Sequence, residues 1–586
     1  MKLKLLLTAL AACTIYNTHA AADTKYAEPL DTITPADETL WYSSQYRKSA
    51  ELTWASKDSV YRSTAPVAQD IIRDLTVKAW RGERVGAEAL VIAPKAVGEV
   101  KVELTGLRKG GKTFNLPDTY AAWMRYVIGN DCRKCWCDDP DKNVSSFPDM
   151  IDNAGSVINI PARTVRPVWC SVEIPREFDP GIYTADLLLK DAKTGETLKS
   201  IILNIDVCDR TLPRPEDYAF YLDLWQQPYA ISRYYGVKPW SDEHLKLYEP
   251  YARMLARAGQ KVTSVILFYE PWGEQSNDKF QPMVETVRHA DGTYSYDYTI
   301  LDRYVEFMDK NGITGDIECF TMIPWQMEFR YLDEPTGEYK ILKTTTDAPE
   351  YAQLWTPFLQ SLAKHFKEKG WYDRLMIGMD ERGVEDMLRA YKVAQDAVPG
   401  IRMSLAGNYH KELVDKLDVY TILKEDFFPA SDLAMRAGNG YKSLVYTCCV
   451  PPVPNQFINA QPSYGVYIPA YATAAGFDGY LHWSYSNWNN TPMTDSRFQR
   501  LPPGDTFFVY PDGRSSIRYE RMLEGIQLSE KIRLLRKEFA DKKDVDGLLA
   551  LEAALLPIRT GVMRPYYPTS TVVNDLERNI DSLSRR

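Results

Sequence analysis

Short apolar runs that alternate with helical patterns through the middle of the chain constrain its fold more than any other feature. Continuous apolar runs are typical of buried strands in a parallel sheet, whose connections carry helices. Eight such strand units predict a (β/α)8 TIM-like barrel, which we place at residues 216–530. The eight runs cover 219–224, 262–268, 316–320, 375–379, 402–406, 419–423, 444–447 and 479–483.

The 586 residues are too many for one hydrophobic core, so further domains are expected. Alternating or apolar runs punctuated by turn signals predict an N-terminal β-sandwich at 23–210. Pro213 and Pro215 mark a linker to the barrel. After Ser516, two amphipathic helical patterns, to about residue 540 and over 544–555, lead into a predicted C-terminal helical segment at 531–586.

The N-terminus has the pattern of a secretion signal. Two lysines precede an apolar stretch at 5–12, and small residues follow at 18–20, which indicates a signal peptide over 1–22. The run before Cys13 also resembles a lipobox, so lipidation of Cys13 stays open. No later run is apolar enough to span a bilayer. We expect a protein secreted across the inner membrane, either periplasmic or an outer-membrane lipoprotein.

Charge and composition narrow the class of partner. A net charge of -9 and a pI near 5.5, without a basic block, argue against a nucleic-acid partner. The 38 tyrosines and 14 tryptophans exceed what a core needs and suit a cleft in which sugars stack. The sequence does not fix the oligomeric state.

Three cysteines, Cys132, Cys135 and Cys137, lie in one short loop with Trp136. One Cys-x-x-Cys unit with an extra cysteine and no nearby histidine favours a disulfide within the loop over a metal site, and the pairing stays open. We expect no metal and no cofactor. The loop is placed to overhang a neighbouring site.

Asp380 and Glu381 follow directly after the apolar run 375–379 and precede a helical pattern at 384–397. Acids at this point can cap the next helix. In an α/β barrel, however, the chemistry lies just beyond the carboxyl ends of the strands, which is where this pair falls. A regular strand points consecutive side chains to opposite faces, so the pair can act together only if the backbone leaves β geometry there. Gly378 or Gly383 would permit this.

Aromatic and amide side chains follow several other predicted strands, and a barrel would bring them to the same face. Tryptophan faces, asparagine amides and a carboxylate pair together describe a carbohydrate pocket. The candidate substrate-binding residues are Trp225, Tyr269, Trp325, Asn408, Tyr446, His482, Trp483, Trp488 and Asn489.

The chain resembles glycoside hydrolase family 123 in several motifs. Besides Met379-Asp380-Glu381, these are Asp291-Gly292 through Asp297, Leu301-Asp302, Gly312-Ile313, Gly504-Asp505 through Tyr510-Pro511, Ser516 through Arg518, and Glu524-Gly525-Ile526. The resemblance covers the barrel well and the sandwich by architecture only. It implies an exo-acting retaining β-N-acetylgalactosaminidase that releases terminal β-linked GalNAc from glycans or glycolipids.

The resemblance also implies a substrate-assisted mechanism, in which the acetamido oxygen of the sugar attacks its own anomeric carbon and no protein nucleophile is needed. Asp380 would then orient the acetamido group, and Glu381 would be the general acid and base. Two alternatives stay open: a β-N-acetylglucosaminidase of the same mechanism, and a non-catalytic glycan-binding lipoprotein.

Overall fold

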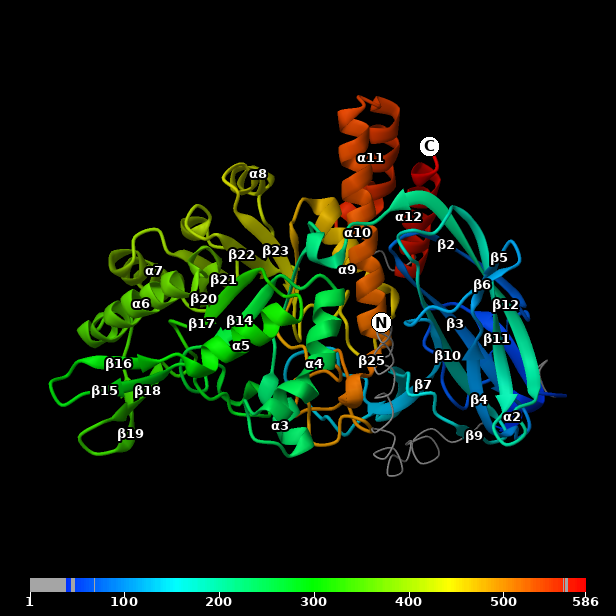
Figure 1. The fold of residues 1–586 in the computed structure, drawn as a ribbon, viewed down its shortest axis with the longest axis horizontal. Coiled ribbons are helices and arrows are strands. Elements are labelled where there is room, and N and C mark those ends of the chain that lie inside the picture. Colours follow the sequence, from blue (N-terminus) through cyan, green and yellow to red (C-terminus); the bar gives the residue numbers. More distant parts are fainter. Residues whose placement is uncertain (1–37, 44–47, 68, 562, 564–566) are drawn as a thin grey trace, which may run out of the picture.

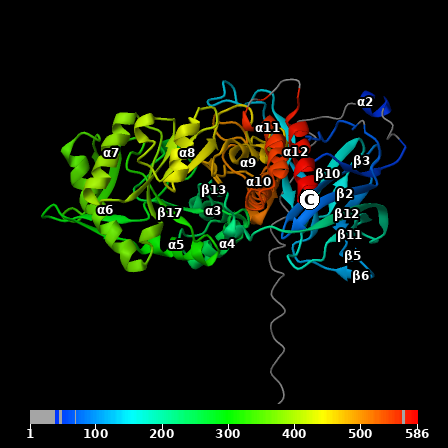
Figure 2. The ribbon, with the colours of Figure 1, turned by 90° about the horizontal axis from the view of Figure 1, so that it is seen from above.

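A computed structural model describes residues 38–43, 48–67, 69–561, 563 and 567–586. The predicted signal peptide and Cys13 lie outside these residues. The described chain forms a β-sandwich, a barrel and a group of C-terminal helices that stand between them (Figures 1 and 2). No helix among the described residues is long and apolar enough to cross a bilayer.

The sandwich packs two sheets around one apolar core, as the turn-punctuated strands predicted. Strand β3 is buried along its whole length, because one face covers the second sheet and the other is covered by a C-terminal helix and by Trp41 and Tyr61. The first sheet has the order β1 (Glu51–Ala55), β3 (Arg84–Ala93), β10 (Thr164–Glu173), β7 (Tyr120–Gly129), β8 (Ser145–Asp152), β25 (Ser515–Ser516). The second has the order β2 (Asp74–Arg81), β12 (Thr197–Thr211), β11 (Gly181–Asp191), β4 (Gly98–Leu104), β9 (Ile158–Ile160); β5 (Leu107–Lys109) also pairs with β11, and β6 (Lys112–Phe114) pairs with β5.

All eight predicted barrel strands are present in one parallel sheet. The sheet is nearly closed, and a single bridge between Leu222 and Gln260 joins its two edge regions. The strands, in chain order, are β13 (Tyr221–Leu224), β14 (Val262–Ile266), β17 (Asp316–Phe320), β20 (Leu375–Met379), β21 (Arg402–Gly407), β22 (Val419–Leu423), β23 (Lys442–Thr447) and β24 (Gly479–His482).

Helices cover the outside of the barrel, with one exception. Between β21 and β22 the chain makes only a short 3-10 turn at Lys411–Leu413. A separate four-stranded sheet extends from the loops after β14 and β17 and was not predicted; it consists of β15 (Glu285–Arg288), β16 (Tyr294–Asp297), β18 (Glu328–Asp333) and β19 (Glu338–Lys343). The barrel helices are α3 (Pro228–Tyr235), α4 (Asp242–Arg257), α5 (Thr299–Lys310), α6 (Pro349–Lys369), α7 (Val384–Ala397), α8 (Ala430–Gly438) and α9 (Ser463–Ala475).

Three C-terminal helices follow the barrel: α10 (Ile517–Asp541), α11 (Val545–Arg559) and α12 (Thr569–Ser584). Helix α10 lies against both domains, and α11 and α12 pack against α9 and α10. The boundary placed after residue 530 falls inside α10. The prediction that α10 is amphipathic was wrong, because its first half is buried on all sides between sandwich and barrel. Three charged side chains of this first half are buried as ion pairs with the sandwich: Arg518 with Asp149 (2.9 Å), Arg521 with Asp58 (2.6 Å) and Lys531 with Glu83 (2.7 Å).

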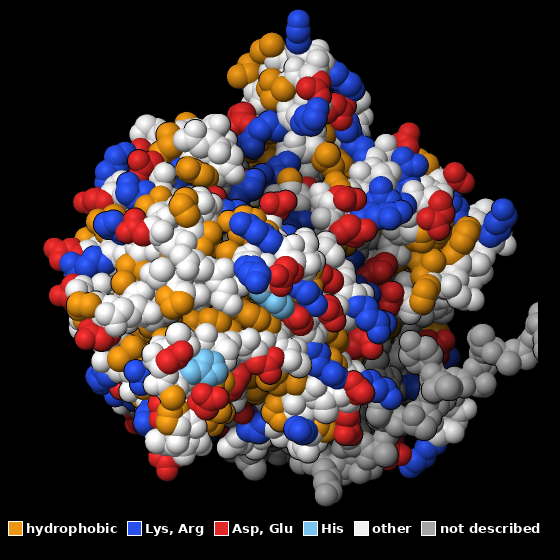
Figure 3. Space-filling view, turned by 60° about the vertical axis from the view of Figure 1, so that its left-hand side comes forward, with side chains coloured by type: hydrophobic (Ala, Val, Ile, Leu, Met, Phe, Trp, Pro, Cys, Tyr) orange, Lys and Arg blue, Asp and Glu red, His pale blue; other side chains and the backbone are white. Residues whose placement is uncertain are grey.

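The outer half of the α10–α11 pair projects from the body of the molecule, and apolar side chains are visible on it at the top of Figure 3. Val545, Leu549 and Leu556 of α11 are exposed. Elsewhere on the face in Figure 3, acidic and basic side chains are interspersed. That distribution fits the modest net charge of -9.

Candidate active site

A pocket opens at the carboxyl ends of the barrel strands, and the acid pair lies in it. Trp225 follows β13, Asp380 and Glu381 follow β20, and Trp483 follows β24. Parallel strands bring these residues together although they are far apart in the chain. The pocket is lined by Trp136, Trp225, Trp272, Gln275, Trp325, Asp380, Glu381, Ala406, Tyr446, Cys448, Cys449, Leu481, Trp483, Gln499, Leu501 and Asp505.

Asp380 and Glu381 share this pocket because β20 ends at Met379, one residue before the pair. Beyond that point the chain is irregular, and the Glu381 backbone N–H donates to Asp380 Oδ1 over 2.8 Å. Gly378 has a packing role: a Cβ there would lie 2.7 Å from the Phe320 ring. Gly383 is the residue before α7.

The two carboxylates have different surroundings. Asp380 is 7% exposed, and burial raises its pKa to about 6, with a further rise from the Glu381 charge. Glu381 is more exposed, and its Oε1 accepts a hydrogen bond from the Tyr446 hydroxyl. Burial, and then the Glu381 charge, raises the pKa of Tyr446, so this phenol stays a donor. Tyr446 therefore fixes the orientation of Glu381.

Aromatic rings form the floor of the pocket. Trp225 and Trp272 stack at 5.3 Å between centroids, and Phe320 packs against both. Trp225 is 4% and Trp272 7% exposed. Trp325 stands at the rim, 36% exposed, with the Arg382 guanidinium 4.8 Å from its ring centroid. The floor is thus a buried apolar surface of the kind on which a sugar ring can stack.

Asp505 is a third carboxylate of the pocket, which sequence reasoning did not select. Trp483 Nε1 donates to its Oδ2 over 3.1 Å, while Oδ1 is buried and accepts no hydrogen bond from the described residues. Burial raises the pKa of Asp505 to about 7. Its Gly504-Asp505 motif was visible, but no barrel strand directly precedes it.

Five predicted substrate-binding residues lie outside the pocket: Tyr269, Asn408, His482, Trp488 and Asn489. His482 falls between Leu481 and Trp483, which both line the pocket; its own ring points the other way, and Nε2 bonds the Asp505 carbonyl at 2.8 Å. Burial lowers the pKa of His482 to about 4.

Of the other four, three make contacts away from the pocket and one, Asn408, is exposed to solvent. Trp488 is fully buried and donates to the Val509 carbonyl over 2.7 Å. The Asn489 amide donates to the backbone of its own loop. The ring of Tyr269 packs under the Arg330 guanidinium, and Asn408 is exposed.

Four predicted binding residues, Trp225, Trp325, Tyr446 and Trp483, do line the pocket. Of the lining residues that the sequence did not suggest, Ala406 and Leu481 lie in strands β21 and β24, and Trp272, Cys448 and Cys449 lie a few residues after β14 and β23. The others, Gln275, Gln499, Leu501 and Asp505, come from longer loops. No periodicity marks loop residues such as Gln275 and Gln499, so the sequence carries no signal for them.

Two disulfides lie beside the pocket. Cys132 pairs with Cys137 inside the loop, as the sequence favoured. Cys135 pairs with Cys449, a partner from the barrel that the sequence did not indicate. Among the described residues, no group of three or more His, Cys, Asp or Glu side chains is arranged to hold a metal ion.

Comparison with known proteins identifies the family. The family model described as "Glycoside hydrolase 123, catalytic domain" matches residues 225–535, more than half of the chain, and "Glycoside hydrolase 123 N-terminal domain" matches 54–191. No curated protein sequence matches.

Among solved structures, a family 123 glycoside hydrolase from Clostridium perfringens, studied for glycolipid glycan hydrolysis, aligns with a TM-score of 0.82 at 21% identity over 92% of this chain and 99% of that one. This likeness shows the fold. A β-galactosidase from Marinomonas ef1 aligns with a TM-score of 0.33 at 11% identity over 59% of this chain and 66% of that one, which carries no argument. The chain is therefore a glycoside hydrolase and belongs to glycoside hydrolase family 123.

Proposed function

We propose that this enzyme is an exo-acting retaining β-N-acetylgalactosaminidase that works by substrate-assisted catalysis. The observation that carries the proposal is the placement of Asp380 and Glu381, two consecutive acids that face one aromatic-floored pocket. One acid is buried and the other more open to solvent, so the pair can divide two tasks.

In the first step, ionised Asp380 accepts a hydrogen bond from the acetamido N–H of the bound sugar, which makes the acetamido oxygen a better nucleophile. That oxygen bonds to the anomeric carbon as the glycosidic bond breaks. The Glu381 carboxyl gives its proton to the leaving oxygen, and the sugar becomes an oxazolinium intermediate.

In the second step, Glu381, now a carboxylate, takes a proton from water as that water bonds to the anomeric carbon. The ring of the intermediate opens and restores the acetamido group. Two inversions give net retention of configuration. Tyr446 holds Glu381 in line for both proton transfers.

The substrate we propose is a glycan or glycolipid with a terminal β-linked GalNAc. The Clostridium perfringens enzyme with the same fold acts on glycolipid glycans, which supports this class. Asp505 Oδ1 is buried, accepts no hydrogen bond from the described residues and has His482 Nε2 3.8 Å away, so it supplies an acceptor for a sugar hydroxyl.

We also propose that the protein is secreted and is either periplasmic or an outer-membrane lipoprotein. The disulfides Cys132–Cys137 and Cys135–Cys449 support this, because such bonds persist in oxidising compartments. The N-terminal signal pattern is the second support.

A β-N-acetylglucosaminidase would use the same acid pair and differ in how the pocket reads the sugar O4. Initial rates on nitrophenyl β-GalNAc and β-GlcNAc, measured side by side, decide between them. We expect faster release from GalNAc; faster release from GlcNAc would overturn the assignment. The third reading, a non-catalytic glycan-binding protein, disagrees with membership in a hydrolase family.

Two variants separate the roles of the acids. Glu381→Gln should lose orders of magnitude on nitrophenyl β-GalNAc but much less on the dinitrophenyl glycoside, whose leaving group needs no proton. Asp380→Asn should lose similarly on both, because both need acetamido participation. Wild-type turnover in either variant, or release of the inverted anomer seen by NMR, would refute the mechanism.

A further inference from the structure

The loop Cys132–Cys137 belongs to the sandwich but reaches the barrel pocket. It leaves the sandwich between β7 and β8, and Trp136 at its tip lines the pocket together with residues that follow the barrel strands. The pocket is therefore completed by a side chain from the other domain.

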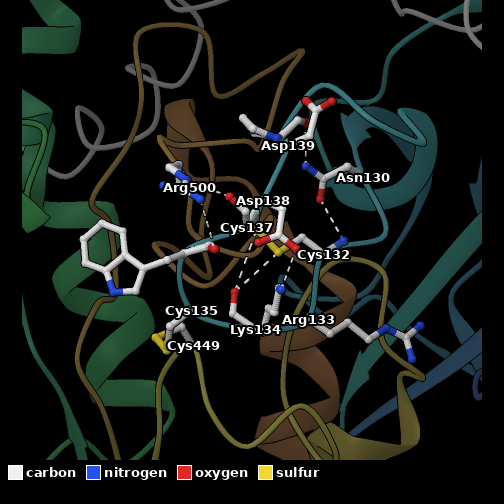
Figure 4. Close-up of a disulfide and its surroundings, with 12 residues drawn as sticks. Asn130, Cys132, Arg133, Lys134, Cys135, Cys137, Asp138, Asp139, Cys449 and Arg500 are labelled. Atoms are coloured by element: carbon white, nitrogen blue, oxygen red, sulfur yellow. Dashed lines mark hydrogen bonds and ion pairs between the residues drawn. A yellow bond between two sulfur atoms is a disulfide. The ribbon is translucent and has the colours of Figure 1, made fainter.

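Covalent and hydrogen bonds fasten this loop to the barrel rim (Figure 4). Cys135 is bonded to Cys449, which also lines the pocket. The Cys137 N–H donates to the Arg500 carbonyl over 2.7 Å, and Arg500 Nε donates to the Cys137 carbonyl over 2.6 Å. Arg133 donates to the Asn459 carbonyl over 2.6 Å. The position of Trp136 is thus set by the barrel as well as by its own domain.

The backbone of Trp136 has an uncommon conformation. Its φ of 58° lies in the left-handed region, which a bulky side chain rarely adopts. Its side chain is 59% exposed, and its ring meets no other ring or cation among the described residues. A large aromatic face kept open at a pocket mouth is a surface available to a ligand.

The depth of the pocket indicates which part of the substrate reaches this face. An exo-acting enzyme takes the terminal sugar toward the buried floor, at Trp225 and Trp272, beside the acids. The remainder of the glycan leaves through the mouth. Trp136, at the mouth and exposed, meets that remainder.

We infer that Trp136 is a stacking platform for the sugar ring on the leaving-group side, and that the Cys135–Cys449 bond positions it. The inference deepens the proposed function and rests on it. Trp136 sets preference for an extended glycan, while the acids of the barrel carry out the bond cleavage.

The test compares two substrates of one terminal hexosamine: an oligosaccharide, with a sugar on the leaving-group side, and the glycosyl fluoride, which has none. Trp136→Ala should lower kcat/KM for the oligosaccharide roughly threefold to tenfold, the worth of one aromatic stacking contact. Turnover of the fluoride should stay within about twofold of wild type. Trp136→Phe should recover most of the oligosaccharide rate.

A second pair of variants tests the disulfide. Cys135→Ser/Cys449→Ser should show the same oligosaccharide-selective loss, and adding Trp136→Ala to it should cost little more, since both act through one contact. Cys132→Ser/Cys137→Ser, which keeps the inter-domain bond, is the matched control. If the serine variants fold poorly, the Trp136 variants alone test whether this side chain contacts the sugar on the leaving-group side.

The outcomes distinguish a failure of the proposed function from a failure of the role inferred for Trp136. A wild type inactive on both substrates would overturn the proposed function and this inference with it. A wild type active on both, with Trp136→Ala losing equally on both or on neither, would overturn this inference alone.

Discussion

Replacing Asp380 with asparagine should stabilise the protein while removing its activity. The buried carboxyl has a pKa of about 6, against an ordinary value of 3.8. At a pH above both values the folded protein must hold an unfavourable buried charge. The difference corresponds to about 3 kcal/mol of lost stability. Asparagine carries no charge, and its Oδ1 can still accept the Glu381 N–H.

The sign of the pH dependence follows from the direction of this shift. Between about pH 4 and pH 6 the folded protein binds more protons than the unfolded chain, so the Asp380 contribution to stability falls as pH rises. Below that window both states are protonated and asparagine offers no advantage through charge. Above it the advantage is complete and constant.

Thermal unfolding by calorimetry at pH 4, 5, 6 and 7.5 measures this difference. At pH 7.5, about 3 kcal/mol should raise the midpoint by about 3 °C if the barrel and the sandwich unfold as one unit of roughly 540 residues. The gap should close toward pH 4. Asp396→Asn, at an exposed carboxylate paired with Lys392, controls for the loss of one negative charge. An Asp380→Asn variant that melts no higher than wild type at pH 7.5, or a gap that ignores pH, would refute the argument.

Three further predictions concern the pocket and the buried ion pair between α10 and the sandwich. The pH profile of kcat/KM should show an acidic limb near pH 6, since the acetamido N–H needs ionised Asp380; full activity down to about pH 4.5 would contradict this role. Asp505→Asn should lower kcat/KM roughly tenfold to a hundredfold by weakening a hydrogen bond to a sugar hydroxyl, and unchanged steady-state kinetics would remove Asp505 from the site. Arg518→Met should cost about 3–5 kcal/mol in urea unfolding, because Asp149 is left buried without its guanidinium; a loss below about 1 kcal/mol would mean that the pair is not needed.

The barrel could be predicted from the sequence because each of its strands is buried and reads as a continuous apolar run. The same reasoning placed Asp380 and Glu381 just beyond the end of a barrel strand, where they line the pocket, because a strand end is visible in the sequence. It failed for α10, whose arginines and lysine look solvent-facing but are buried against carboxylates of the sandwich. Pairing across hundreds of residues leaves no local pattern.

The pocket could be predicted only in part, for the same reason. Trp225, Tyr446 and Trp483 lie in or next to strands, so their position in the barrel followed from the register. His482 was expected in the pocket but does not line it, because successive side chains along β24 point to opposite faces and its ring faces away. Gln499 and Asp505 come from loops whose path only the folded chain defines. Cys449 lies two residues after β23, and no local pattern indicates its disulfide partner in the other domain.

The chain returns to the sandwich after the barrel, which limits how the two domains can be separated or exchanged. Strand β25 adds to the sandwich sheet beside β8, and α10 then inserts its arginines there. A truncation at the proline linker would strip the barrel of counter-ions and the sandwich of an edge strand. The two halves are interlocked rather than tethered, so grafting the sandwich of one enzyme onto the barrel of another would require transplanting α10 with it.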